Sequence, residues 1–311
     1  MGLLWRGKHK FSHIESTGVA IGFGGGANNL LGGKTYFVNC RSGNDGYPGT
    51  NPREPLATLE AAEAKCTSYK NDYIFCQEFW ALTTESPIVF DKVHMHVIGL
   101  GNGCFWDNGN DIGALDSSGI AVLMSGCTNL ELAGFNIGGD ATADAISVAG
   151  TTYRVHLHDC TLGNNYACLD GIGEGTEGNM GKWLVERCLF GQTLVGDGIN
   201  CSMLSSVIKD CLFTEIAVKG IDMPAGQSWN KILGCQFFSP IASALDSGWG
   251  ITLGATSFDN IVMGCHATDS GDSGGNEPYR DNSSADAATA LNGWSGNMFG
   301  NAFIDPDDSA D

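Results

Sequence analysis

Three aspartates recur at nearly equal intervals along the middle of the chain, and their side chains suit hydrolytic chemistry. Asp144, Asp170 and Asp197 precede Ala or Gly, and Lys219 takes the fourth position of the series. If each interval is one structural repeat, Asp170 and Asp197 lie on adjacent strands, roughly 4.8 Å apart. Two neighbouring carboxylates can cleave a glycosidic bond, because crowding raises the pKa of one of them. The simpler alternative is that Asp before Gly is a turn signature that repeats with the fold.

Two His-x-His pairs are the candidate metal ligands. In a β-strand, alternation places both members of His94/His96, and both members of His156/His158, on one face. Either pair could bind a metal ion or meet its symmetry mates on an oligomer axis. The alternative, which we favour, is that they are ordinary surface residues of strands. Exposed tryptophans could stack on sugars or pack at an interface, and the candidates are Trp229, Trp249 and Trp294.

Seven short segments of the chain repeat one pattern, in which apolar residues and a short turn precede Cys or a small or amide residue. The registering position is occupied in turn by Gly134, Cys160, Cys188, Cys211, Cys235, Cys265 and Asn301. Between the segments, the aspartate series leads into a second column of apolar residues, Ile146, Ile172, Ile199, Ile221 and Ile251. Two registered columns with about two dozen residues per repeat indicate a solenoid of stacked β-coils.

The cysteine column predicts an internal file of thiols. A thiol is small and tolerates burial, so it can stack on its equivalent in the next coil. Disulfides between coils are the competing interpretation, but the N-terminus has no secretion signal and implies a reducing cytoplasm. Zinc is disfavoured because the chain has no Cys-x-x-Cys pair. We therefore expect a core ladder of free thiols at Cys160, Cys188, Cys211, Cys235 and Cys265.

The N-terminal part resembles the opening of pectate-lyase-like proteins. The resemblance rests on the strand-like residues 35–39, the turn-rich residues 43–50 and the helix-like residues 55–62, in which Thr58 can cap a helix. It implies an all-β, right-handed parallel β-helix solenoid with a short N-terminal capping helix and an extended N-terminal arm. The expected organisation is a basic, Gly-rich arm (1–34), a capping strand, turn and helix (35–72), the coils (73–268), and a polar excursion, final strand and acidic tail (269–311).

The charge distribution limits the partners. The net charge is −19, and residues 1–34 carry +3 of charge against −22 on the rest. A strongly acidic body argues against nucleic acid and against an anionic membrane surface. The basic arm, with Arg6, Lys8 and Lys10, could dock on an acidic neighbour. We expect no cofactor, because the Gly-rich residues 22–27 lack the Lys-Ser/Thr ending of a phosphate loop.

The resemblance implies a fold but not a chemistry, because the same opening occurs in lyases, hydrolases and phage virion proteins. The Asn-Thr-Asp, Gly-His-Gly and Arg-Ile-Lys blocks of polygalacturonase-like hydrolases do not occur in the chain. By elimination, we expect a bacteriophage virion structural protein, either a head decoration or a tail or spike component, made in the host cytoplasm. It would be a homotrimer that contacts other virion proteins such as the major capsid protein, and carbohydrate is a further possible partner. The alternative is a polysaccharide lyase or glycoside hydrolase that uses the aspartate column.

Overall fold

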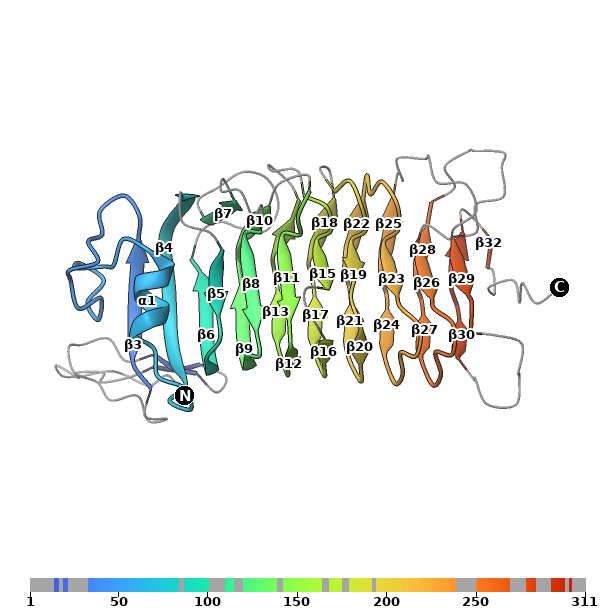
Figure 1. Ribbon diagram of the computed structural model, residues 1–311, viewed down its shortest axis with the longest axis horizontal. Coiled ribbons are helices and arrows are strands. Elements are labelled where there is room, and N and C mark those ends of the chain that lie inside the picture. Colours follow the sequence, from blue (N-terminus) through green and yellow to red (C-terminus); the bar gives the residue numbers. More distant parts are fainter. Residues whose placement is uncertain are drawn as a thin grey trace, which may run out of the picture.

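The chain winds into a right-handed parallel β-helix, as predicted (Figure 1). The computed structural model describes residues 14–16, 19–21, 33–83, 87–100, 110–114, 120–138, 142–163, 168–174, 179–191, 194–238, 250–268, 278–283, 292–299 and 302–303. Successive coils stack side by side along the axis and form three ribbons of parallel strands, called here sheets 1, 2 and 3. Within the described residues, no helix is both long enough and apolar enough to span a membrane.

Sheet 1 runs along the solenoid from the capping strand to the last coil. Its strands are β3 (Thr35–Asn39), β4 (Asp72–Thr83), β6 (Val93–Gly99), β9 (Thr128–Ala133), β13 (His156–His158), β17 (Leu184–Glu186), β21 (Val207–Lys209), β24 (Lys231–Leu233), β27 (Ile261–Met263) and β30 (Gly293–Ser295). Three short strands extend its edge, namely β12 (Thr151–Tyr153), β16 (Asn179–Gly181) and β20 (Met203–Leu204).

Sheets 2 and 3 complete each coil. Sheet 2 shares β4 with sheet 1 and continues through β7 (Asn110–Ala114), β10 (Asn136–Gly138), β14 (Thr161–Leu162), β18 (Leu189–Gly191), β22 (Leu212–Thr214), β25 (Gln236–Phe238), β28 (His266–Ala267) and β31 (Met298–Phe299). Sheet 3 consists of β5 (Ile88–Phe90), β8 (Val122–Ser125), β11 (Ile146–Ala149), β15 (Ile172–Glu174), β19 (Ile199–Asn200), β23 (Ile221–Met223), β26 (Ile251–Leu253) and β29 (Tyr279–Asp281).

The N-terminal end is closed by helix α1 (Leu59–Lys65), which packs against β3 and β5. The Thr58 hydroxyl accepts a hydrogen bond from the Ala61 N–H at 3.2 Å, so Thr58 caps the helix as expected. Asp45, in the preceding turn, accepts the Thr58 hydroxyl at 3.0 Å and ties the cap to that turn. Before the cap, β1 (Ile14–Ser16) and β2 (Val19–Ile21) pair antiparallel, while Arg6, Lys8 and Lys10 lie outside the described residues.

The core consists of inward-facing residues that stack from coil to coil. The isoleucine column of sheet 3 pairs in register from Ile146 to Ile251 and ends on Tyr279. At the corner between sheets 1 and 2, a buried file of thiols runs through Cys160, Cys188, Cys211, Cys235 and Cys265. Each Sγ points to a backbone carbonyl of the coil before it, at 3.8 to 3.9 Å. All eleven described cysteines are free thiols, and Cys104 lies outside the description.

The two ends of the predicted thiol column need correction. Phe135, not Gly134, precedes Cys160 in the file, because His158 pairs with Ala133. Asn297, not Asn301, follows Cys265, and its Oδ1 accepts the Cys265 N–H at 3.0 Å. In each coil a left-handed residue, with φ between 51° and 77°, immediately precedes the residue of the file, and this position identifies Phe135 and Asn297 as the two ends. The left-handed residues are Gly134, Asp159, Arg187, Asp210, Gly234, Gly264 and Gly296.

The polar excursion predicted for residues 269–296 is interrupted by two solenoid strands. Tyr279–Asp281 forms β29 against β26, and Gly293–Ser295 forms β30 against β27. The predicted final strand is two short strands, since β31 turns back and pairs antiparallel with β32 (Ala302–Phe303). The strands at 279 and 293 are short, so their sequence lacks the apolar alternation that marks a strand. Stacking on the preceding coil holds them, together with the Tyr279 hydroxyl, which donates to the Met298 carbonyl at 3.1 Å, and the Trp294 Nε1, which donates to Asp281 at 3.1 Å.

A second internal ladder, which the sequence patterns did not bring out, is made of amides. Asn230, Asn260 and Asn292 occupy equivalent positions in successive coils of sheet 1. The Asn260 Oδ1 accepts the Asn230 N–H at 3.0 Å, and the Asn292 Oδ1 accepts the Asn260 N–H at 3.1 Å. The Asn260 Nδ2 also donates to the Gln227 carbonyl at 3.0 Å. The ladder therefore satisfies backbone groups that would otherwise be buried without partners.

Replacing Asn260 with Ala should lower the free energy of unfolding. The substitution leaves the buried Asn230 N–H without its acceptor, at a cost of about 1–3 kcal/mol, and removes one of two donors to the Gln227 carbonyl, which keeps the Phe258 N–H. Urea unfolding followed by circular dichroism measures the change. Asn179→Ala, on the edge strand β16 outside the ladder, is the matched control and should cost no more than about 0.5 kcal/mol. Equal effects of the two substitutions would contradict a structural role for the ladder.

Candidate functional site

The aspartate column lies where the repeat predicted, at the turns leading into sheet 3. Asp170 and Asp197 are on adjacent coils, and each is 6% exposed. The Asp170 Oδ1 accepts the Asp197 N–H at 2.6 Å, and the Asp197 Oδ1 accepts the Lys219 N–H at 2.8 Å. The Lys219 ammonium pairs with Asp222 at 2.6 Å. The carboxylates thus join one coil to the next, which is the behaviour expected of a repeated turn signature.

Burial changes the acidity of this column. It raises the pKa of Asp197 to about 7 and that of Asp144 to about 6, and in both cases the Asp170 carboxylate adds to the effect. Burial also raises the pKa of Asp170. One carboxylate with a raised pKa beside another is a combination that glycosidases use. However, the oxygens of Asp170 and Asp197 are directed at backbone N–H groups of neighbouring coils, so a substrate would have to displace structural hydrogen bonds.

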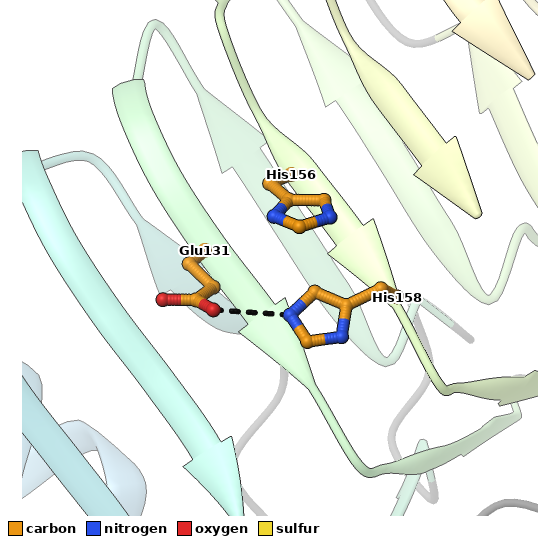
Figure 2. A group of neighbouring side chains, drawn as sticks. All are labelled: Glu131, His156 and His158. Atoms are coloured by element: carbon orange, nitrogen blue, oxygen red, sulfur yellow. Dashed lines mark hydrogen bonds and ion pairs between the residues drawn. The ribbon is translucent and has the colours of Figure 1, made fainter. Parts of the chain in front are cut away.

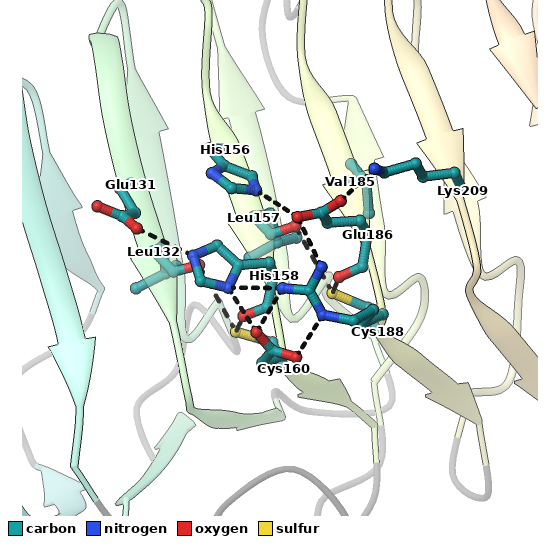
Figure 3. A network of polar contacts seen from close by, with 12 residues as sticks. Glu131, Leu132, His156, Leu157, His158, Cys160, Val185, Glu186, Cys188 and Lys209 are labelled. Carbon is teal, nitrogen blue, oxygen red and sulfur yellow. Dashed lines mark hydrogen bonds and ion pairs between the residues drawn. The ribbon is translucent and has the colours of Figure 1, made fainter. Parts of the chain in front are cut away.

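A different set of polar side chains converges on the outer face of sheet 1. We call it the histidine–carboxylate cluster, and it comprises Glu131 of β9, His156 and His158 of β13, Asp159, Glu186 of β17, Arg187 and Lys209 of β21 (Figure 3). Strand register assembles it. His156 pairs with Glu131, and His158 pairs with Glu186, which in turn pairs with Lys209. Inward-facing Leu132, Leu157 and Val185 alternate with these residues and are buried beneath them.

Glu131 and the two histidines form the centre of the cluster (Figure 2). The His158 Nε2 lies 3.0 Å from one Glu131 oxygen, and the His96 Nδ1 lies 2.5 Å from the other. The two imidazoles of β13 are neighbours, with ring centroids 4.2 Å apart. Hydrogen bonds from His158 and His96 lower the pKa of Glu131. Glu131 is therefore ionised over the whole physiological pH range.

Two further carboxylates hold the outer nitrogens of the histidines. Asp159 lies 2.6 Å from the His158 Nδ1, and Glu186 lies 3.0 Å from the His156 Nε2. Burial lowers the pKa of His158, but the hydrogen bonds to Glu131 and Asp159 outweigh burial and leave the pKa above its ordinary value. Burial lowers the pKa of His156, and the adjacent His158 adds to the effect. The two histidines thus differ in environment although they are two residues apart.

Arg187 and Lys209 complete the cluster. Arg187 forms two hydrogen bonds to Asp159, at 2.7 and 2.9 Å, and an ion pair with Glu186 at 2.7 Å. Lys209 pairs with the other Glu186 oxygen at 2.6 Å. Burial would raise the pKa of Glu186, but hydrogen bonds from Lys209, Arg187 and His156 outweigh it and lower the pKa to about 2. Both cations are more than a third exposed, so they are accessible to a ligand on this face.

Left-handed backbone also occurs at the corner beside the cluster. Asp159 and Arg187 have φ of 53° and 51°, at the position that is Gly in four other coils. Asp210 adopts the same conformation in the next coil, and Arg154 and Lys182 adopt it at another corner. The conformation is therefore a feature of the coil corners, and the paired hydrogen bonds from Arg187 to Asp159, not backbone strain, distinguish the cluster.

The structure separates the histidines that the sequence grouped. His156, His158 and His96 belong to one surface, whereas His94 lies at a left-handed corner, with φ of 61°, and its ring contacts Tyr69. His96 instead stacks on Tyr73, with ring centroids 4.2 Å apart, and its Nε2 lies 2.9 Å from the Asn71 Oδ1. His96 therefore links the cluster to an aromatic row on the same face.

Sequence reasoning missed Glu131, Asp159, Glu186, Arg187 and Lys209. All five lie in the repeated segments from which the coil pattern was deduced. Comparing those segments position by position for outward-facing residues would have placed Glu131 beside His156, and Glu186 between His158 and Lys209. Of the three candidate tryptophans, Trp229 is 53% exposed, Trp294 packs partly against the core, and Trp249 lies outside the described residues.

Solved structures with a similar fold include carbohydrate-active enzymes. Pectin methylesterase from Yersinia enterocolitica is 13% identical with a TM-score of 0.50, and the match covers 80% of this chain and 92% of that one. Escherichia coli YbhC is 11% identical with a TM-score of 0.50, at 93% and 90% coverage. The GH136 lacto-N-biosidase from Eubacterium ramulus is 13% identical with a TM-score of 0.50, at 87% and 56% coverage. No protein-family model and no curated protein matches the sequence. These likenesses establish the β-helix fold.

Proposed function

We propose that this β-helix is a polysaccharide-active enzyme that cleaves glycosidic bonds on the outer face of sheet 1. The observation that carries the proposal is that one open sheet face bears both an aromatic row and the histidine–carboxylate cluster. The row consists of Phe37, Phe75, Tyr73 and His96, with successive ring centroids 6.1, 6.0 and 4.2 Å apart. Aromatic rings offer a surface on which sugar rings can pack, while the adjacent cluster offers groups that transfer protons.

The geometry of the face suits an extended chain. The aromatic row lies on β3, β4 and β6, and the cluster follows on β9, β13, β17 and β21, so both continue along the solenoid axis. Arg187 and Lys209 can donate hydrogen bonds to sugar oxygens beside the histidines. The net charge of −19 repels polyanions, so we expect a glycan with few acidic groups to be the preferred substrate.

The comparisons favour this proposal over the virion interpretation. A pectin methylesterase and a lacto-N-biosidase are carbohydrate-active enzymes by name, and both share the fold. The virion interpretation stays a prediction. So do the homotrimer, the arm of Arg6, Lys8 and Lys10 that docks on neighbours, and a contact with the major capsid protein. The alternative predicted from the sequence was a polysaccharide lyase or glycoside hydrolase that uses Asp144, Asp170 and Asp197. We keep this reaction class and propose the histidine–carboxylate cluster as the active centre instead.

Activity on a panel of neutral and acidic polysaccharides tests the proposal. New reducing ends report any cleavage, and ultraviolet absorbance of an unsaturated product reports elimination alone. Glu131→Gln and His158→Ala should each lower kcat/KM by about 100-fold or more, because proton transfer by a positioned side chain contributes typically 10²–10⁴-fold. Asp170→Asn is the matched control and should retain activity. Cleavage that is lost in Asp170→Asn but retained in the cluster variants would return the active site to the aspartate column.

A further inference from the structure

We propose that Glu131, His156 and His158 form a binding site for a divalent transition-metal ion of the Zn²⁺ type. One potential ligand atom from each of these residues lies within 4.8 Å of the other two (Figure 2). Two histidines and one glutamate are a common ligand set of catalytic zinc, which leaves one coordination position open. Ca²⁺ fits less well, because it prefers a shell made of oxygen alone.

The existing contacts are close to metal-site geometry. Zinc binds His nitrogen and carboxylate oxygen at about 2.0–2.2 Å, which places two tetrahedral ligands roughly 3.4 Å apart. The His158 Nε2 and the Glu131 Oε1 are 3.0 Å apart, at hydrogen-bonding distance. A metal ion bound between them needs the two atoms to separate by a few tenths of an ångström. His156 lies on the same strand face, and one of its ring nitrogens lies within 4.8 Å of the other two ligand atoms.

Each of the two imidazoles has a carboxylate partner on the ring nitrogen that would not bind the metal. Metal-binding histidines almost always donate their second ring N–H to a carboxylate, a carbonyl or water. Asp159 holds the His158 Nδ1 at 2.6 Å, which leaves Nε2 to bind the metal. Glu186 holds the His156 Nε2 at 3.0 Å, so that Nδ1 is the ligating atom there. His96 holds the outer oxygen of Glu131. All three ligands thus have a second partner that fixes their orientation.

Charge also favours a cation at this position. The cluster has three carboxylates, Glu131, Asp159 and Glu186, against the two permanent cations Arg187 and Lys209. Both cations pair with Asp159 and Glu186, whereas in the described part of the chain the ion pairs of Glu131 are with His96 and His158. A divalent ion bound through Glu131 would therefore be attracted by this carboxylate without displacing Arg187 or Lys209.

The test is titration of the full chain, freed of metal by a chelator, with Zn²⁺ alone under reducing conditions. Isothermal titration calorimetry should show one site that is lost in His158→Ala and His156→Ala. Asp159→Asn should weaken the affinity by roughly 10–100-fold, as expected for a residue that orients a ligand. His94→Ala is the matched control and should bind like the wild type. Co²⁺ should bind at the same site and give a visible spectrum without thiolate charge-transfer bands, which excludes the cysteines as ligands.

Failure to bind Zn²⁺ at millimolar concentration, or unchanged affinity in both histidine variants, would overturn the proposal. If the variants do not fold, imidazole ¹⁵N chemical shifts of the wild type decide the question. Shifts at the His158 Nε2 and the His156 Nδ1 on adding Zn²⁺ support the site, and their absence overturns it. Because it involves no sugar, the titration is independent of the proposed activity. Metal binding without polysaccharide cleavage refutes the enzyme alone, and cleavage by a protein that binds no metal refutes the metal site alone.

Discussion

Stability should fall as the pH rises from about 5 to about 8, and Asp197→Asn should remove the largest single part of that fall. Burial raises the pKa of Asp197 from its ordinary 3.8 to about 7, with Asp170 and Asp222 adding to the effect. The folded state therefore keeps a proton that the unfolded chain has already released in this range. The stabilisation is fully present below about pH 4 and is lost as the pH passes through about 7. Each pKa unit corresponds to 1.36 kcal/mol, so the change is on the order of 4 kcal/mol.

Asp197→Asn is a clean probe because the amide can keep the main structural contact. The Asn Oδ1 can accept the Lys219 N–H as the carboxylate oxygen does at 2.8 Å. Urea unfolding at about pH 5 and about pH 8 should show the variant to be the more stable protein at the higher pH. Asp144, whose pKa is raised to about 6, contributes a residual slope of the same sign.

Asp210→Asn controls for the loss of one negative charge, since Asp210 lies at an exposed left-handed turn. It should not reproduce the gain in stability that Asp197→Asn shows at high pH. Should wild type and Asp197→Asn show parallel pH profiles, Asp197 would not be a buried, protonated carboxyl.

Residues that must be buried could be predicted from the sequence. The isoleucine column from Ile146 to Ile251 pairs as expected, because each coil needs one apolar residue at that inward position. The ends of the thiol column could not be placed by residue type alone. Phe135 and Asn297 take the place of cysteine there, and the left-handed residues Gly134 and Gly296 reveal this only when φ is known.

The candidate site was less predictable for a related reason. Outward-facing polar residues are free to vary from coil to coil, so Glu131, Glu186 and Lys209 produce no periodic signal. Their contacts with His156 and His158 depend on which residues of separate segments pair, and that register follows from the buried partners beneath them. The His-x-His motif was visible in the sequence. The carboxylates that contact the histidines could be identified only from the register of the stacked strands.

Phe213→Ala should be the most destabilising single substitution in the core of the central coils. Phe213 is 1% exposed and stacks between Phe190 and Phe237, with ring centroids 4.7 and 4.8 Å apart and interplanar angles of 8° and 14°. Removing a buried phenyl ring typically costs about 3–5 kcal/mol, and each lost stack adds about 0.5–1.5 kcal/mol. Equilibrium unfolding in urea measures the loss.

The same ring explains the glycine that follows Asp197. Gly198 does not adopt a left-handed φ, and the decisive feature is the space around its Cα. A Cβ at Gly198 would lie 2.7 Å from the Phe213 ring and 2.5 Å from the Gly220 carbonyl oxygen. Gly171 and Gly220 face Phe190 and Phe237 in the same way. Gly198→Ala alone should therefore destabilise the protein by about 1–3 kcal/mol.

A double-mutant cycle connects the two effects. In the Phe213→Ala background, Gly198→Ala should cost at least about 1 kcal/mol less than in the wild type, because the ring that its Cβ would strike is gone. Part of the cost should persist, since the Gly220 carbonyl remains. Phe90→Ala, a buried residue on β5 several coils away, is the control background and should combine additively with Gly198→Ala to within about 0.5 kcal/mol. Additivity in the Phe213→Ala background as well would mean that the phenyl column does not pack against the glycines, and the packing of β22 against the turn before β19 would have to be revised.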